Sequence, residues 1–377
     1  MNSRFLARMD ARIAECGPGE ARDALVAERA SYLARLGHVD EARQVLSDLR
    51  LKWGETPSAR VSSLVHIADG LCHYYTDMGP EARDRFLRAH ALARAASLGD
   101  VVVRAASWLA LVHYGAYRFP DMVRSLDECF LGTPHTDPST LARSCLVVAQ
   151  TVHLANRFDL ALPWYRRVRL LSAETEDEAT ISALMHNMAS IWATNSRNAL
   201  LGGPPTRDSS RQALAGAMST LNFDDLVGLT NLSVFTPLLR AQVCSIEGDC
   251  EQALLLYENH LSALSLKAVK GWQVWLLADK GWCQLQTGKS QLAKESCETA
   301  ESVLTADMHV DDRAATLTRL SRAYAKFGDG TEAERCEVEA GVCWRDFAAL
   351  QELMLSAVES SRGVRWMADQ RPLRRLK

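Results

Sequence analysis

A forty-residue period runs through most of this 377-residue chain, and it constrains the fold more than any other feature. A small residue, usually Ala, recurs five positions after a turn residue such as Gly or Asn. We call these recurring positions anchors, and they are Ala42, Ala82, Met122, Ala161, Ala213, Ala253, Ala293 and Ala333. Their spacings are 40, 40, 39, 52, 40, 40 and 40 residues. Near-equal intervals of this length predict an array of structural repeats.

Each repeat is expected to be a pair of amphipathic helices joined by a tight turn. In the fourth unit, apolar residues recur at helical spacing in residues 141–154 and again in residues 160–171. Gly and Asn tolerate the left-handed backbone conformation that ends a helix, and they stand five positions before an anchor at Gly37, Asn156, Gly248, Gly288 and Gly328. In two less regular units Asp77 and Tyr117 take this position. One hairpin cannot bury both of its apolar faces, so neighbouring hairpins must stack. The sequence therefore predicts one elongated all-α domain.

The period divides the chain into three segments. Residues 1–19 are expected to form an N-terminal capping segment, residues 20–345 the repeat array, and residues 346–377 a C-terminal capping helix with a basic tail. The one long interval, in the fifth unit, holds residues 201–210, with the sequence LGGPPTRDSS. An insertion in a regular array is either a place where binding concentrates or a tolerated irregularity, and both interpretations remain open here.

The spacing of small and aromatic residues around the turns resembles the tetratricopeptide repeat (TPR). Two units show it well, with Ala149, Val152, Asn156, Ala161 and Tyr165 in one and Ala241, Cys244, Gly248, Ala253 and Tyr257 in the other. The resemblance implies a right-handed α-solenoid superhelix of about eight helix hairpins plus a C-terminal capping helix. The period exceeds the usual 34 residues, which is similar to the long-helix variants that serve as sensor arms in bacterial signalling and transcription regulators. Some of those arms precede diguanylate cyclase domains. No cyclase signature follows Lys377, so the expectation is an arm alone or a stand-alone relative of one.

Charge and cysteine content narrow the classes of partner and compartment. A net charge of −3 gives no global support for binding nucleic acid. The tail from Arg362 to Lys377 is the exception, because it carries six basic residues against Asp369 alone. It is either a solvated end or a contact for an acidic partner, nucleic acid or a membrane. The ten cysteines form no Cys-x-x-Cys pair, and no apolar run is long enough to insert in a membrane. We expect a cytoplasmic protein with structural thiols.

Motifs for catalysis, cofactors and metals are weak. Gly288-Lys289-Ser290 would need a glycine at position 283 to be a phosphate-binding loop, but that residue is Cys283. None of the ten histidines forms a His-x-x-x-His pair of metal ligands. We therefore expect no cofactor, no catalytic metal and no enzymatic activity.

In a TPR-like array, the first helix of each hairpin lines the concave surface. Counting back from each turn gives ten inward or rim residues, namely Tyr74, Arg104, Tyr114, Arg143, Gln150, His153, Gln242, Trp275, Trp282 and Arg322. The polar pair His186-Asn187, within an apolar helical stretch, is added to them. For each of these residues packing between hairpins is the alternative. Trp272, in the same helix as Trp275 and Trp282, is expected to fill the core.

Aromatic, arginine and amide side chains together favour recognition of a peptide. The sequence therefore predicts a non-enzymatic scaffold or regulatory adaptor that binds a protein or peptide in its concave groove. The alternative is a sensor arm that holds a small-molecule signal near His153, Asn187 and the tryptophans, for a diguanylate cyclase-type or transcription output. The sequence identifies neither the partner nor the oligomeric state.

Overall fold

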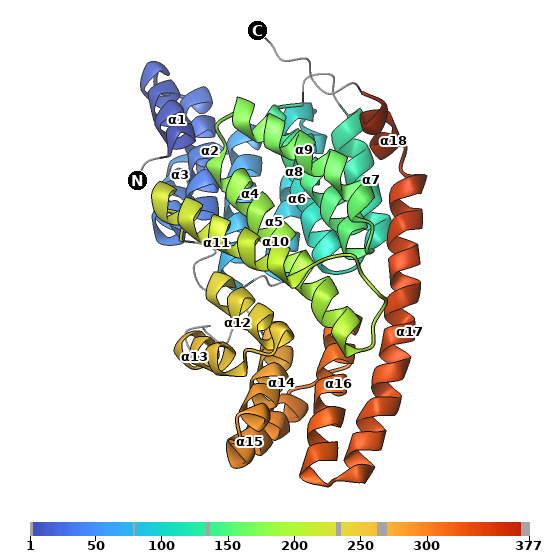
Figure 1. Ribbon diagram of the computed structural model, residues 1–377. Coiled ribbons are helices and arrows are strands. Elements are labelled where there is room, and N and C mark those ends of the chain that lie inside the picture. The colour runs from blue at the N-terminus through green and yellow to red at the C-terminus, as the bar shows by residue number, and fades with distance from the viewer. Residues whose placement is uncertain (1–2, 78–79, 133–135, 231–234, 262–269, 371–377) are drawn as a thin grey trace.

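The computed structural model describes residues 3–77, 80–132, 136–230, 235–261 and 270–370, and all regular structure within them is α-helical (Figure 1). Eight hairpins pair α2 (Glu20–Leu36) with α3 (Val39–Trp53), α4 (Ala59–Asp77) with α5 (Pro80–Ala95), α6 (Gly99–Gly115) with α7 (Phe119–Leu131), α8 (Pro138–Leu154) with α9 (Phe158–Glu174), α10 (Glu178–Leu201) with α11 (Ser210–Val227), α12 (Phe235–Glu247) with α13 (Cys250–His260), α14 (Lys270–Gln286) with α15 (Ser290–Ser302), and α16 (Val310–Phe327) with α17 (Gly330–Ser360). Helix α1 (Arg4–Glu15) precedes them and α18 (Arg362–Asp369) follows. The predicted all-α solenoid of helix hairpins is confirmed.

The anchors lie where the two helices of each hairpin meet. All eight are in the second helix of a hairpin, and seven of them are at most 1% exposed, with Ala333 at 8%. A small side chain at this point lets the two helix backbones approach closely without leaving a void. The repeat register predicted from the sequence is therefore confirmed.

The five predicted Gly and Asn turn residues have the left-handed conformation, whereas Asp77 is the last residue of α4 and does not. The backbone angle φ is positive at Gly37, Gly248, Gly288 and Gly328, and it is 61° at Asn156. Tyr117 has φ of 54°, which costs a side chain of its size about 1–2 kcal/mol. Its ring stacks on His309 with centroids 4.1 Å apart, and its hydroxyl donates a hydrogen bond to Asp311 Oδ1 at 3.0 Å. These contacts with the start of α16 hold the strained turn.

The array curls back on itself, so the expected elongated domain is not what forms. Figure 1 shows α17 running alongside the third and fourth hairpins, with α18 placed on α7. Arg197 of α10 forms an ion pair with Asp312 of α16 at 2.8 Å, and Gln351 Nε2 of α17 donates to Leu154 O at 2.8 Å. Small rotations per hairpin have therefore accumulated into a closed arrangement.

The C-terminal segment differs in detail from its prediction. Helix α17 is 31 residues long and passes through the boundary expected at residue 346, because apolar residues such as Cys343, Trp344 and Phe347 continue at helical spacing and are buried. The helix ends before Ser361, whose hydroxyl accepts a hydrogen bond from Val364 N and begins α18. The expected capping helix thus consists of the end of α17 and α18. The basic tail from residue 371 onward lies outside the described residues.

The cysteines are free thiols, and eight of the ten are buried. Burial raises the pKa of Cys145 to about 12, which disfavours the thiolate needed for nucleophilic or redox chemistry. Among the helices of the described ranges, none is both long and apolar enough to cross a membrane.

Candidate functional site

Ten of the twelve predicted site residues occupy three recurring positions of the first helices. Counted back from the anchor, position 18 is occupied by Arg104, Arg143 and Trp275, position 11 by Gln150, Gln242, Trp282 and Arg322, and position 8 by Tyr74, Tyr114 and His153. Because these positions are seven and three residues apart, they share one face of an α-helix. We call this face of the first helices the inner face. The first helices contact one another directly, α2 with α4, α6 with α8, and α8 with α10.

Arg104 is committed to contacts within the array. Its Nη1 lies 2.7 Å from Glu28 Oε1 of α2, and its Nη2 lies 3.9 Å from Asp137 Oδ2 at the start of α8. These two ion pairs tie the first, third and fourth hairpins together. Arg104 therefore has its counter-charges inside the molecule.

His153 lies inside the hairpin packing and not on an accessible surface. It is fully buried, with Nδ1 2.9 Å from Tyr165 OH and Nε2 3.1 Å from Asp208 Oδ2. Asn195 of α10 donates to the same Asp208 oxygen at 2.8 Å. Asp208 belongs to the loop of residues 201–210, so His153 helps to fix that loop.

The same loop also makes a hydrogen bond to the fourth hairpin and packs closely against α17. Thr206 Oγ1 donates to Asn156 Oδ1 at the turn of the fourth hairpin at 2.5 Å. A Cβ added to Gly203 would lie 2.8 Å from the Trp344 ring of α17, so only glycine fits there. The insertion therefore connects the fourth hairpin with the C-terminal helix.

Tyr74 and Tyr114 are partly exposed on the inner face. Tyr74 packs edge-to-face against Tyr75, with ring centroids 5.2 Å apart. Burial raises the pKa of the Tyr74 and Tyr114 hydroxyls, so both stay neutral at physiological pH and can donate and accept hydrogen bonds.

Three buried amide or imidazole side chains on successive first helices each lack a partner for one polar atom among the described residues. These atoms are Gln150 Oε1 on α8, His186 Nδ1 on α10 and Gln242 Nε2 on α12. Burial lowers the pKa of His186 to about 4, so the imidazole is neutral. His186 is thus buried but not satisfied. Its neighbour Asn187 is half-buried.

The guanidinium of Arg143 lies 3.7 Å from the centroid of the Trp108 ring. Its Nη1 donates a hydrogen bond to Ser107 Oγ at 2.7 Å. Arg143 is only 8% exposed, and burial together with the nearby positive charge of Arg35 lowers its pKa to about 9. The protein thus holds a guanidinium cation in a buried position, where an ionised group destabilises the fold unless it is paired.

The tryptophans of α14 serve packing. Trp275 is 9% exposed and lies under the Arg197 guanidinium at 4.9 Å, and Trp282 lies under Arg319 at 5.3 Å. Both stack on arginines of neighbouring first helices, as cation–π pairs do. The side chain of Trp272 lies outside the described residues.

Near the junction of α10 and α16, Arg322 and a cluster of three possible metal ligands have their partners within the fold. Arg322 Nη2 donates to Leu200 O at 3.2 Å. The ligand atoms of His309, Asp311 and Asp312 lie within 4.8 Å of one another, as metal ligands would. Arg197 already supplies the positive charge between the two carboxylates. We therefore assign no metal to this group.

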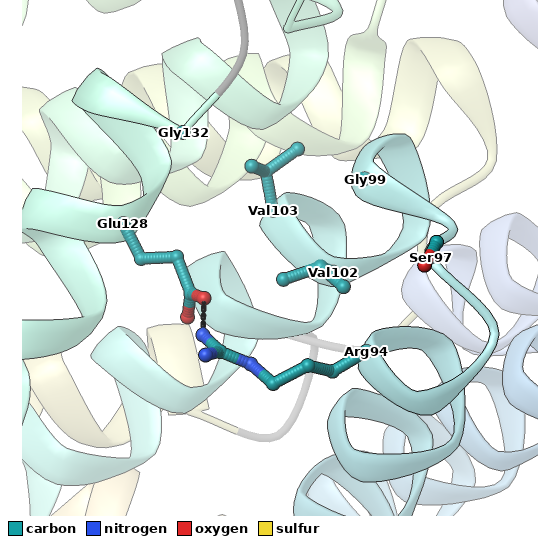
Figure 2. Close-up of a pocket in the computed structure, with 7 residues that line it drawn as sticks. All are labelled: Arg94, Ser97, Gly99, Val102, Val103, Glu128 and Gly132. Atoms are coloured by element: carbon teal, nitrogen blue, oxygen red, sulfur yellow. Dashed lines mark hydrogen bonds and ion pairs between the residues drawn. The ribbon is translucent and has the colours of Figure 1, made fainter.

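A shallow pocket has none of the inner-face candidate residues in its lining. It has a volume of about 220 Å³ and lies between α5, α6 and α7 (Figure 2), lined by Arg94, Ser97, Gly99, Val102, Val103, Glu128 and Gly132. Its two charged side chains, Arg94 and Glu128, pair with each other, and His90 Nε2 lies 2.6 Å from Glu128 Oε2. The pocket thus offers no uncommitted charge to a ligand, and the inner face is the stronger candidate.

No protein-family model matches the sequence, and no curated protein does. Among solved structures, the chain is similar to the crystal structure of a Rap protein complexed with Competence and Sporulation Factor, with a TM-score of 0.55 and 11% sequence identity. The similarity covers 93% of this chain and 92% of that one. At this identity the likeness shows the helical-repeat fold alone.

Proposed function

We propose that this chain is a non-enzymatic scaffold or regulatory adaptor that binds a segment of another protein on its inner face. The observation that carries the proposal is that three successive first helices each bury a polar atom without a partner among the described residues, namely Gln150 Oε1 of α8, His186 Nδ1 of α10 and Gln242 Nε2 of α12. A buried polar atom without a partner costs about 1–3 kcal/mol. A bound segment with its own N–H and C=O groups would supply the missing partners.

The aromatic side chains of the inner face support the same proposal. Tyr74, Tyr75 and Tyr114 are partly exposed. Tyrosine offers a large contact area and a hydrogen bond for little loss of side-chain entropy. The Rap protein of similar fold is itself complexed with another molecule, the Competence and Sporulation Factor. Binding on a fold of this kind is thus compatible with the resemblance.

The proposal that the chain is not an enzyme is based on the burial of its reactive groups. Among the described residues, the constellation that most resembles a catalytic one is His153 with Asp208 and Tyr165. His153 has no exposed surface, and the Asp208 side chain is 5% exposed. A substrate could not reach these groups without displacing the loop of residues 201–210.

A second candidate is a sensor of a small molecule that controls a signalling or transcription output. It is favoured by the tight closure of the inner face, where Arg35 of α2 reaches Asp177 at the start of α10 at 2.8 Å. Arg104 likewise reaches Glu28 of α2. These bridges join α2 to α6 and to α10, and a compact ligand would disturb them less than a protein segment would.

Selection with purified full-length protein separates the two candidates. The probes are a display library of random 12-residue peptides and a metabolite panel screened by thermal shift. We expect the wild type to select related peptides and the double variant Gln150→Met, Gln242→Met to lose them, because methionine is of similar size but removes the unpartnered amides. The control Gln291→Met, at an exposed position of α15, should bind as the wild type does.

Stabilisation by a metabolite without any peptide selection would favour the sensor. If neither probe is recognised, or the double variant binds peptides as well as the wild type, the inner face is not the binding site.

A further inference from the structure

Four arginines of the described residues are more than nine-tenths buried, namely Arg35, Arg143, Arg197 and Arg319. Three of them have a carboxylate partner. Arg35 pairs with Asp177 at 2.8 Å, Arg197 with Asp312 at 2.8 Å, and Arg319 with Asp279 at 2.6 Å. Arg143 alone has no carboxylate within 4.0 Å in the described part of the chain.

The carboxylates nearest to Arg143 are engaged elsewhere. Asp177 accepts from Arg35 at 2.8 Å and from Thr180 N at 3.0 Å. Burial opposes ionisation of Asp177, but the positive charge of Arg35 overcomes it and holds the pKa of that carboxyl below its ordinary value. Asp137 caps the first turn of α8 through Thr140 N at 3.0 Å. Both carboxylates favour the charged form of Arg143, but neither lies within 4.0 Å of its guanidinium, and burial still lowers its pKa to about 9.

A buried charge without a partner destabilises a fold by several kcal/mol. Of its five N–H donors, the Arg143 guanidinium uses one for Ser107 Oγ, while its ring-facing side rests on Trp108. Stacking fixes the plane of the guanidinium, and an edge with paired N–H groups matches a carboxylate in bidentate geometry. The cation is thus pre-organised for direct contact with a carboxylate, which none of the described residues makes with it.

Two further polar groups share this part of the inner face. Gln150 is seven residues after Arg143 on α8, so it lies on the same face about 10 Å further along the helix, with its Oε1 unpartnered. Burial raises the pKa of the Tyr75 hydroxyl on α4. The positive charges of Arg35 and Arg143 both oppose this rise, as nearby cations do. A cation, a phenol and an amide oxygen therefore lie in one part of the array. Arg143 and Gln150 are only 8% and 4% exposed, so a bound segment must part the neighbouring side chains to reach them.

We propose that Arg143 binds a carboxylate of an acidic partner segment, and that Gln150 accepts a backbone N–H of the same segment. An extended chain advances about 3.3 Å per residue, so the 10 Å between the two groups corresponds to about three residues. The partner segment thus carries Asp, Glu or a C-terminal carboxylate about three residues from the N–H that Gln150 accepts. This inference rests on the proposed function and specifies the chemistry of its site.

The test uses purified full-length protein and an array of random 12-residue peptides, in which every Asp or Glu peptide is paired with its Asn or Gln counterpart. The wild type is expected to bind acid forms at least about tenfold more tightly than amide forms. Arg143→Met should reduce this ratio to within about twofold. Arg166→Met, which removes an exposed arginine of α9, should leave it unchanged. Arg143→Lys keeps the charge but not the bidentate geometry, so its ratio of acid to amide affinity should be intermediate. If Arg143→Met does not fold, Arg143→Lys replaces it in the test.

Peptide binding by the wild type without preference for the acid forms would overturn the carboxylate site while leaving the scaffold intact. So would a preference that survives in Arg143→Met. No peptide binding at all would overturn both proposals. Inorganic phosphate and N-acetylglutamate are tested alone by thermal shift, since they share the anionic chemistry. One outcome would keep the anion site but replace its ligand. In it, phosphate or N-acetylglutamate stabilises the wild type as strongly as the best peptide does and leaves Arg143→Met unchanged. The ligand is then a free small anion instead of a protein segment.

Discussion

Arg35 and Arg143 are both buried on first helices, α2 and α8. Arg35 forms an ion pair with a carboxylate, whereas Arg143 does not among the described residues. Arg35→Met would leave Asp177 buried and unpaired, which typically costs about 3–5 kcal/mol. Arg143→Met removes a charge that has no such partner, so we expect the unfolding free energy to stay equal or rise. Urea denaturation followed by circular dichroism would compare the two midpoints. Equal losses in both variants would mean that Arg143 is as well compensated as Arg35.

The pH dependence of stability tests the burial of His186. Burial lowers the pKa of folded His186 to about 4, whereas an unfolded histidine has a pKa of about 6.5. Between these values the unfolded chain binds a proton that the folded chain does not, so stability is full above pH 6.5 and falls as the pH drops toward 4. His186→Met should remove up to about 3 kcal/mol of this pH dependence.

Thermal melting from pH 7.5 to pH 4.5 would measure the effect. His260→Gln, at the half-buried end of α13, is the matched control. If the wild type and His186→Met melt in parallel over this range, the imidazole already reaches water in the folded state.

The repeat period assigned ten of the twelve candidate residues to three offsets from the anchors, and these offsets share one face of a first helix; that a partner binds on this face stays a prediction. The period could not predict their partners. Arg104 pairs with Glu28, and His153 with Asp208 of the inserted loop, at distances along the chain that no period encodes. The isolation of Arg143 could not be predicted either, because it depends on Asp177 being bound by Arg35.

At the scale of elements, the attachment of α18 depends on one carboxylate of α7. Asp127 Oδ1 accepts hydrogen bonds from Ser361 Oγ at 2.5 Å and from Gly363 N at 2.7 Å. Asp127→Ala should loosen α18 by about 1.5–3 kcal/mol, the usual contribution of hydrogen bonds to a charged group. Hydrogen exchange of residues 362–369 would then accelerate while that of α8 stays slow.

Gly363→Ala offers an independent route to the same result, since its Cβ would lie 2.9 Å from Asp127 Cα. Asp159→Ala, at an exposed position of α9, is the control. Unchanged exchange in both variants would show that apolar contacts alone hold α18.

The hairpins were predictable as elements, since five of the turns carry a Gly or Asn suited to the left-handed conformation that ends a helix. The boundary at residue 346 was not, because apolar spacing continues through Trp344 and Phe347 and gives no signal to stop. The helix ends where Ser361 can cap α18 against Asp127. That contact joins positions 234 residues apart, so it depends on the tertiary fold and not on local sequence.

For the whole molecule, closure of the array is set by the accumulated rotation between hairpins, and a repeat sequence does not reveal this rotation directly. The contacts that record the closure join the third and fourth hairpins to the eighth hairpin and α18. They are Tyr117 with His309 and Asp311, Gln351 with Leu154, and Asp127 with α18. We call this set of contacts the seam. Because stability within the array comes from neighbouring hairpins, the seam can open without unfolding any hairpin.

Breaking the seam should therefore change shape more than helicity. We expect the combined variant Tyr117→Gly, Gln351→Met, Asp127→Ala to keep its far-ultraviolet circular dichroism but to gain a few ångström in radius of gyration by small-angle X-ray scattering. Tyr117→Gly also relieves the left-handed strain at φ of 54°, so the turn of the third hairpin itself should not weaken. The Arg197–Asp312 ion pair stays in place and should limit the opening. Tyr117→Phe, which keeps the ring stacking on His309, is the control for the turn. A scattering profile identical to that of the wild type would mean that the curvature is intrinsic to the stacked hairpins and that the seam only follows it.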